Sequence, residues 1–288
     1  MSLLSRPIIL LLALLALSSC QVSRKNDSNR FVVLSPELAE LIVALGAEDM
    51  IVGVTSECDY PASLRKLTQV GSFGSVDLEK VISLKPSIVF TSALEQESIA
   101  LNLKKLGLRV ESSYPGSLDD MLAEILKIGT ILGRVKEAQA LYVSLREDIR
   151  MIREEAMNKP QPKVYLEIYK DPLMSVADKS FVGELLETAG ADNIFNKLER
   201  DYSRVKAEDV IHFQPDIMIC YSQDTLAGIQ ARKGWQVVPA IKNGMVFFED
   251  DIHPDLIQRA GPRSIQGMQK LAELYNRWRQ SQYATSLQ

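Results

Sequence analysis

The chain has 288 residues, of which 46% are hydrophobic, and a formal net charge of −4. This is enough apolar material for one large domain or two smaller lobes with cores of their own, and the length favours two lobes. The mildly acidic balance, without any block of like charge, argues against nucleic acid as a partner.

The first nineteen residues have the pattern of an export signal. A single charge, Arg6, precedes an unbroken apolar run from Ile8 to Leu17, which ends at Ser18, Ser19 and Cys20. An apolar run of about ten residues is too short to cross a hydrocarbon core roughly 30 Å thick. We therefore expect this segment to be removed rather than to span a membrane.

The residues around Cys20 resemble the bacterial lipobox, in which small residues precede a cysteine that is lipidated and becomes the mature N-terminus. The resemblance implies a signal peptide at residues 1–19, a lipidated Cys20, and a polar tether over residues 20–30. The domain would then work outside the cytoplasm, in the periplasm or at the cell surface, held to a membrane only through Cys20. An ordinary signal peptide is the alternative.

Short β-rich runs then alternate with helical patterns along the chain. The runs are Phe31–Leu34, Ile51–Val54, Ile88–Thr91 and Val164–Ile168. This alternation predicts an α/β fold with mostly parallel sheets, as an N-terminal lobe over residues 31–116 and a C-terminal lobe over residues 159–288. Ligands bind at the carboxyl ends of the strands of such sheets.

Residues 117–158 connect the two lobes. Apolar residues recur there at helical spacing, Ser117 is suited to begin a helix, and Pro160 follows the end of the pattern. The sequence predicts a stiff helical connector, broken near Gly133.

Two segments of the chain occur twice. Glu79–Ile88 matches Glu208–Ile217 at five of ten positions with an offset of 129, and Glu40–Ala47 matches Glu184–Ala191 with an offset of 144. In the first pair a short helix stops before a proline and a buried strand follows. Duplication of this unit predicts two related lobes.

The chain resembles the periplasmic substrate-binding proteins of ABC importers that bind cobalamin, ferric siderophores and haem, and its motifs are most similar to those of the vitamin B12-binding proteins. The resemblance covers nearly the whole mature chain and rests on five segments: Leu34–Glu40, Asp59–Pro61, Gln69–Phe73, Glu79–Phe90 and Arg259–Arg263. It implies two Rossmann-like lobes joined by a long rigid helix, with the ligand in a cleft between them. We expect a monomeric, non-enzymatic binding protein without a cofactor, which transports cobalamin or a ferric chelate.

In this family a glutamate on each lobe pairs with arginines of the permease, which works with its ATPase. The positions that match are Glu79 and Glu208, the first residues of the duplicated segment. Two carboxylates held apart on a rigid body give orientation and register to docking. The alternative is a pair of solvated glutamates that only stabilise helix N-termini.

Aromatic side chains near strand ends are candidates for holding a bulky, partly planar ligand. These are Tyr60, Phe73, Tyr169, Tyr202 and Tyr221. The resemblance to the cobalamin binders gives Phe73 and Tyr202 a ligand-facing role, and it matches Asp255 and Arg259 to an acid and a base that contact the corrinoid. For these last two, a local ion pair is the alternative.

Other ligands remain open in the sequence. Tyr60 matches the segment in which related haem binders carry an axial tyrosine, and Arg204, Arg259 and Arg263 could serve an anionic ferric siderophore. A free-metal site is disfavoured because only His212 and His253 are available as histidine ligands. No catalytic motif occurs in its required context.

Only Cys58 and Cys220 remain after Cys20, and they are far apart in sequence. A disulfide framework therefore does not hold this fold together, although the sequence leaves open a single bridge between the two. Cys58 is interpreted as a small core residue. A purely structural lipoprotein is the third functional class. Such a protein would need neither a ligand cleft nor duplicated docking glutamates.

Overall fold

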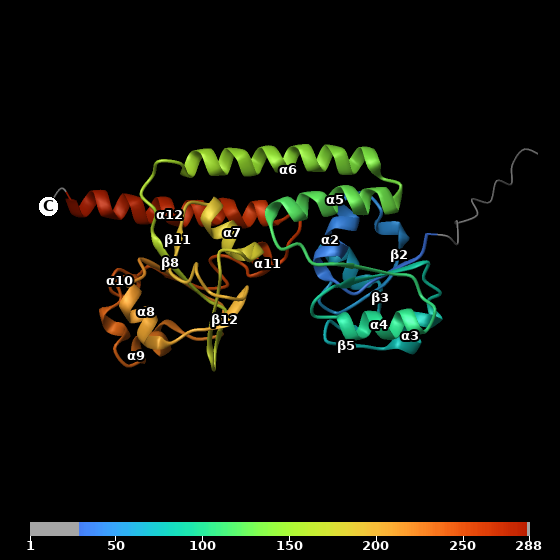
Figure 1. Cartoon of the computed structure of the whole chain (residues 1–288), viewed down its shortest axis with the longest axis horizontal. Helices are drawn as coiled ribbons and strands as arrows, with labels where there is room; N and C mark the ends of the chain where they lie inside the picture. The colour runs from blue at the N-terminus through green and yellow to red at the C-terminus, as the bar shows by residue number, and fades with distance from the viewer. Residues whose placement is uncertain (1–28, 287–288) are drawn as a thin grey trace, which may run out of the picture.

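Two parallel β-sheets, one in each half of the chain, form the centres of two lobes that lie side by side (Figure 1). The computed structural model describes residues 29–286, with side chains as far as residue 283. The expected signal peptide at residues 1–19, the lipid-bearing Cys20 and most of the tether over residues 20–30 lie outside the described residues. The α/β class with mostly parallel sheets, expected from the sequence, is confirmed.

The sheet of the N-terminal lobe has five parallel strands in the order β3-β2-β1-β6-β7. The central strands are buried on both faces, which explains why they are continuous apolar runs rather than alternating ones. The strands are β1 (Phe31–Val33), β2 (Ile51–Val54), β3 (Thr68–Gln69), β6 (Ile88–Ser92) and β7 (Val110–Ser113). The helices are α2 (Pro36–Ala44), α3 (Leu78–Ser83) and α4 (Glu97–Lys105), and a small hairpin joins β4 (Gly71–Ser72) to β5 (Ser75–Val76).

The C-terminal lobe repeats this plan with a four-stranded parallel sheet in the order β11-β8-β13-β14 and adds an antiparallel sheet, β12-β10-β9. The parallel strands are β8 (Lys163–Glu167), β11 (Asp192–Asn193), β13 (Ile217–Cys220) and β14 (Val246–Phe247). The antiparallel strands are β9 (Tyr169–Lys170), β10 (Leu173–Val176) and β12 (Tyr202–Arg204). The helices are α7 (Phe181–Thr188), α8 (Ala207–Phe213), α9 (Leu226–Ala231), α10 (Pro239–Lys242), α11 (Asp255–Gln258) and α12 (Ser264–Ser286).

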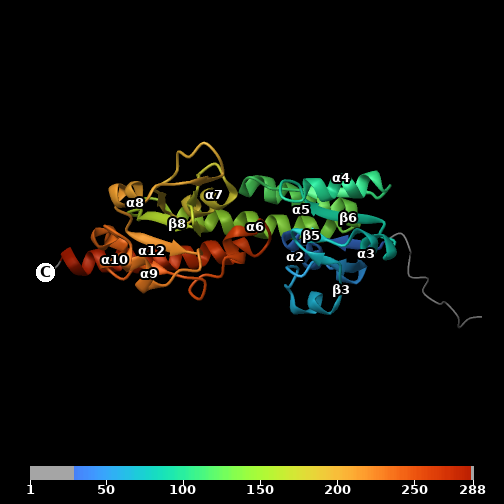
Figure 2. The same ribbon diagram turned by 90° about the horizontal axis from the view of Figure 1, so that it is seen from below.

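The connector between the lobes consists of two helices, α5 (Leu118–Leu132) and α6 (Val135–Ala156). Ser117 caps the first by accepting a hydrogen bond from the Asp120 amide, and Gly133 ends it with φ 69°. The break expected near Gly133 therefore folds the segment back on itself, so that α6 alone runs lengthwise along both lobes, with α12 packed beside it (Figures 1 and 2).

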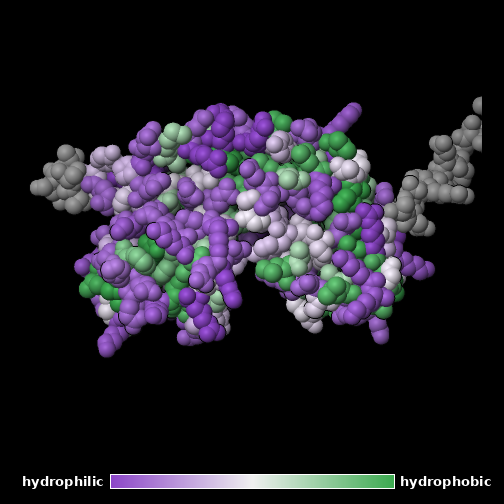
Figure 3. All heavy atoms as spheres, viewed as in Figure 1, coloured by the Kyte–Doolittle hydropathy of each residue, from purple (hydrophilic) through white to green (hydrophobic). Residues whose placement is uncertain are grey.

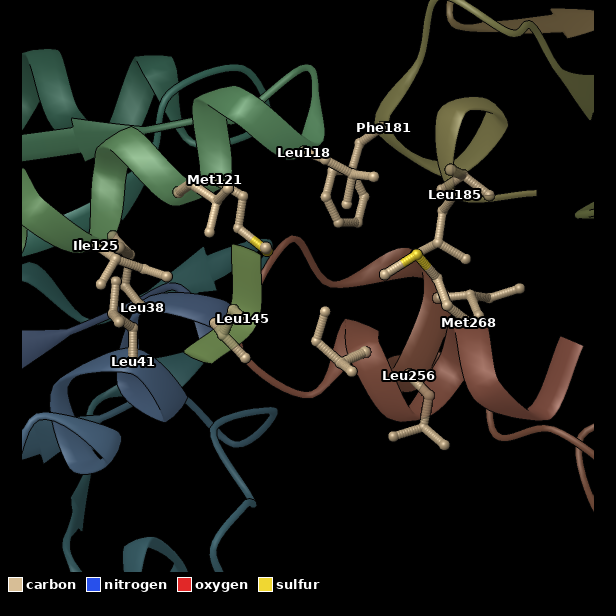
Figure 4. Packing of buried hydrophobic residues seen from close by; sticks show 14 of the residues in the cluster. Leu38, Leu41, Leu118, Met121, Ile125, Leu145, Phe181, Leu185, Leu256 and Met268 are labelled. Atoms are coloured by element: carbon tan, nitrogen blue, oxygen red, sulfur yellow. The ribbon is translucent and has the colours of Figure 1, made fainter. Parts of the chain in front are cut away.

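A single apolar core extends through this connector from one lobe into the other. Leu38 and Leu41 of α2 and Met121 of α5 belong to the same cluster as Phe181 of α7 and Met268 of α12 (Figure 4). Because moving one lobe against the other would expose this shared surface to water, we infer that the lobes are coupled rather than hinged on a flexible linker.

Candidate ligand cleft

A hollow separates the two lobes on the side of the molecule away from α6 (Figure 3). Its floor is formed where α2 of the N-terminal lobe meets the segment between α11 and α12. The closeness is evident at Gly261, where an added Cβ would lie 3.6 Å from the backbone oxygen of Glu37. Two of the sequence segments that carry the family resemblance thus meet here, more than 200 residues apart in the chain.

Glu40 is the centre of an ionic network across this floor. Its side chain is 3% exposed, and its Oε1 lies 2.8 Å from Arg259 Nη1 and 2.5 Å from Arg263 Nη2. Arg263 Nε donates to the second carboxylate oxygen at 2.7 Å. Burial lowers the pKa of Arg263, but the hydrogen bonds and charge of Glu40 outweigh this effect and raise it, so Arg263 is charged and paired with Glu40.

Asp255 and Arg259 form the local ion pair that the sequence left as an alternative to ligand contact. Arg259 Nη2 lies 3.0 Å from Asp255 Oδ2, at the i,i+4 spacing of a helix start. The same guanidinium also lies 3.5 Å from Asp59 Oδ1 and donates to the backbone oxygen of Glu57 at 3.2 Å. Arg259 is thus fully partnered by protein groups, whereas the Asp255 side chain keeps 21% of its surface exposed.

Tyr60 is brought to the same network. Its ring lies under the guanidinium of Arg263, with 3.9 Å from Arg263 Cζ to the ring centroid, and 46% of the residue is exposed. A cation over the ring face is favourable. The arrangement fixes Tyr60 at the floor while leaving part of it accessible.

Phe73 lies in the turn of the β4–β5 hairpin. Its amide donates to Glu57 Oε2 at 2.8 Å, and its carbonyl accepts from Gln96 Nε2 at 2.9 Å. Gln96 is buried and also donates to the backbone oxygen of Leu34, so the hairpin is tied to the sheet. The Phe73 side chain, half-buried, is carried on a fixed backbone.

Tyr202 of β12 approaches the N-terminal lobe across the cleft. Burial raises its pKa, and the neighbouring Tyr114, Glu95 and Asp201 raise it further. Tyr114 and Glu95 follow strands β7 and β6 of the N-terminal lobe. Tyr114, 38% exposed, was missed by the sequence analysis, although it follows a strand end as the other candidates do.

These groups give the cleft an excess of acidic side chains. Burial raises the pKa of the Glu37 carboxyl, a hydrogen bond with Ser35 opposes this, and the charge of Glu95 adds to it. The arginines nearby are already paired with Glu40 and Asp255. The cleft therefore offers hydrogen-bond acceptors and phenol rings, and little uncompensated positive charge.

The remaining candidates are not bonded into the floor network. Tyr169, on the β9–β10 hairpin, is 54% exposed, whereas Tyr221 is buried and donates to the backbone oxygen of Ile252 at 2.9 Å, as a core residue does. Arg204 lines a cavity of about 590 Å³ beside α8 and is not bonded into the floor network. Cys58 and Cys220 are buried free thiols, so no bridge joins them, and burial raises the pKa of Cys58 to about 12.

Glu79 and Glu208 are both exposed in the first turns of their helices. The two helices, α3 and α8, lie in different lobes on the side away from α6 (Figure 1). Within residues 29–283 neither carboxylate has an ion-pair partner. Both are therefore available to another molecule.

The described residues contain neither a cluster of metal ligands nor a helix suited to crossing a membrane. Among residues 29–286, no three His, Cys, Asp or Glu side chains come together as a metal site; His253 lies 3.6 Å from Asp255 without a third group. None of the helices described is long and apolar enough to cross a membrane.

Comparison with known proteins agrees with this geometry. An ABC transporter substrate-binding lipoprotein of Bacillus subtilis, itself uncharacterized, is 31% identical over 264 residues, which cover 89% of this chain and 82% of that protein. The periplasmic vitamin B12-binding protein of Vibrio cholerae shares the fold with a TM-score of 0.75 at 22% identity, over 87% of this chain and 97% of the other. A periplasmic haem-binding protein of Roseiflexus sp. RS-1 gives 0.77 at 21% identity, over 87% and 99%.

The family model for periplasmic binding proteins matches residues 31–252, which include both parallel sheets and end just before Asp255. Together with two parallel α/β lobes, a shared helical backbone and a cleft floored by both lobes, this match establishes that the chain belongs to the periplasmic binding protein family.

Proposed function

We propose that the protein is the substrate-binding lipoprotein of an ABC import system and that its ligand is cobalamin or another corrinoid. The observation that supports this choice of ligand is the charge of the cleft. Glu37, Glu95 and Asp201 supply acceptors, while Arg259 and Arg263 are neutralised by Glu40 and Asp255.

Corrinoids suit such a cleft better than the alternatives do. The rim of a corrin ring carries amides, whose N–H groups are donors for carboxylates, and its apolar faces suit aromatic side chains. Haem brings two propionates and ferric siderophores are commonly anionic, so both need unpaired cations. The ligand contacts that follow are Tyr60, Phe73, Tyr169 and Tyr202, with Asp255 accepting an amide and Arg259 at the floor beside it.

Haem is the second candidate, and Tyr60 is the observation that favours it. A partly exposed tyrosine at the cleft floor could approach an iron atom as an axial ligand. Against this, the cation nearest the ring, Arg263, is already paired with Glu40.

The binding experiment uses the chain without residues 1–20, titrated with cyanocobalamin, hemin and a ferric siderophore while thermal stability and absorbance are followed. A ligand at 100 times its dissociation constant adds about 2.7 kcal/mol to the free energy of unfolding. Stabilisation by cyanocobalamin alone supports the proposal. Stabilisation by hemin or the siderophore instead would keep the transport class and replace the ligand, and no response to any of them would favour a structural lipoprotein.

Delivery requires a membrane anchor and a permease, and both belong to the proposal. We assign the anchor to Cys20, in the periplasm or at the cell surface, and docking on the permease to Glu79 and Glu208. The docking assignment is supported by the exposure of both carboxylates, by their lack of ion pairs among residues 29–283, and by their duplication in the sequence.

A further inference from the structure

Glu40 of the N-terminal lobe pairs with Arg259 and Arg263 of the C-terminal half. The repeat of residues 40–47 at residues 184–191 does not predict this pairing. The repeat counterpart, Glu184 of α7, instead accepts a hydrogen bond from the Leu118 amide at the start of α5 at 2.7 Å, and lies 3.9 Å from Arg153 of α6. Both glutamates thus reach beyond their own sheet, but only Glu40 neutralises charges at the floor of the cleft. Its role is therefore specific to this position.

The charge balance of the floor depends on Glu40. Three carboxylates, those of Glu40, Asp255 and Asp59, bring three negative charges to the floor. Arg259 and Arg263 bring two positive charges. The exposed Arg65, 3.1 Å from Asp59, brings a third. Counting these six side chains, the formal sum is zero. Of the three carboxylates, Glu40 is the most buried, and it accepts hydrogen bonds from both Arg259 and Arg263, so its removal leaves a positive charge that neighbouring groups compensate least.

We propose that Glu40 is a specificity-determining residue, which lets the cleft keep two arginines at its floor without attracting anionic chelates. This inference rests on the proposed function, in that the cleft is taken as the binding site. Arg259 and Arg263 give the floor its shape and hold Tyr60, and Glu40 cancels the charge that they would otherwise present. A neutral, amide-bearing ligand is accepted, whereas an anionic one meets two arginines that are already paired with carboxylates.

The test compares Glu40→Gln with Glu147→Gln. The second variant removes the same charge from an exposed pair on α6, where Glu147 lies 2.6 Å from Arg150, far from the floor in sequence and on the helix that backs the molecule. Cyanocobalamin serves as the neutral probe, and hemin and a ferric tris-catecholate as anionic probes, at low ionic strength. We expect Glu40→Gln to bind the anionic probes about tenfold more tightly than Glu147→Gln does, equivalent to about 1.4 kcal/mol.

A gain of affinity for the anionic probes distinguishes a specificity role from a structural one, because loss of packing alone would weaken the binding of every probe. Equal affinity of the two variants for the anionic probes overturns the inference. If Glu40→Gln does not fold, Asp59→Asn takes its place, since Asp59 is half-exposed and lies 3.5 Å from Arg259; a smaller gain is expected, and no gain overturns the inference.

The outcome is readable whether or not the ligand assignment holds. Failure of the unmodified protein to bind cyanocobalamin counts against the proposed function and leaves the comparison of the anionic probes intact. Conversely, cyanocobalamin binding with no change in anion affinity counts against Glu40 alone.

Discussion

Individual charged residues in this protein are held by partners that are distant in the sequence. Glu167, at the end of β8, is fully buried and bonded by both nitrogens of Arg232, at 2.6 and 2.7 Å. Ser222 Oγ donates to the same carboxylate at 2.5 Å, and Tyr165 Oη donates at 3.1 Å. Because every lone pair is used, the desolvation cost of this buried charge is offset only while all partners remain.

Glu167→Gln should therefore destabilise the protein by about 3–5 kcal/mol, since it leaves the Arg232 guanidinium without its bidentate partner. The free energy of unfolding is measured by urea denaturation followed by circular dichroism. Glu147→Gln is the control, and a change within about 0.5 kcal/mol is expected there because the pair is exposed. A loss below 1 kcal/mol for Glu167→Gln would show that Asp224, 2.8 Å from Arg232, is a sufficient partner by itself.

At the scale of elements, the turn between α5 and α6 determines how the two lobes are joined. Gly133 takes the left-handed conformation that ends α5, and four residues earlier Gly129 approaches Ala138 so closely that a Cβ would lie 2.2 Å from the alanine methyl carbon. Gly133 permits the chain to reverse direction, and Gly129 permits the two helices to touch. The sequence predicted the break, but the direction of α6 after it depends on this packing.

Gly133→Ala should lower the free energy of unfolding by about 1–2 kcal/mol. An L side chain is strained at this φ, although nothing lies within 4 Å of the added Cβ. Gly133→Asn should cost less, since asparagine tolerates the left-handed region. Thermal unfolding of both is compared with Gly116→Ala, where the added atom makes only an ordinary contact of 3.6 Å with Asp120. Equal costs for alanine and asparagine would contradict the argument from φ.

For the whole molecule, the shared core fixes the distance between the two lobes and hence between the two proposed docking carboxylates. Apolar residues from α2, α5, α7 and α12 form one cluster (Figure 4), so Glu79 and Glu208 are carried on a body that resists large rearrangement. A rigid spacing provides register to a partner that contacts both lobes at once.

Replacing both Glu79 and Glu208 by Ala should abolish uptake of the ligand while leaving its affinity for the isolated protein unchanged, because both carboxylates are exposed and outside the floor network. Transport is measured in cells or proteoliposomes containing the cognate permease, and affinity by titration. The matched control replaces Glu97 and Glu187, exposed glutamates of α4 and α7. Normal transport by the first variant would remove the docking assignment, and a loss of affinity would give these residues a different role.

The sequence by itself determined the α/β class, the two lobes and the helical connector with its break, because these follow from local periodicity, capping residues and duplicated segments. The family came from the resemblance of five short segments to known binding proteins. The sequence placed Glu79 and Glu208 correctly on exposed helix starts, since exposure there follows from the pattern of one short helix. Only the tertiary structure decided which charged residues pair with one another at the floor of the cleft. Glu40 meets Arg259 and Arg263, which lie 219 and 223 positions further along the chain, only in the folded protein. Glu167 likewise meets Arg232, 65 positions further along. Ion pairing of this kind leaves no periodic signal in a sequence, because it depends on which surfaces come together and exclude water.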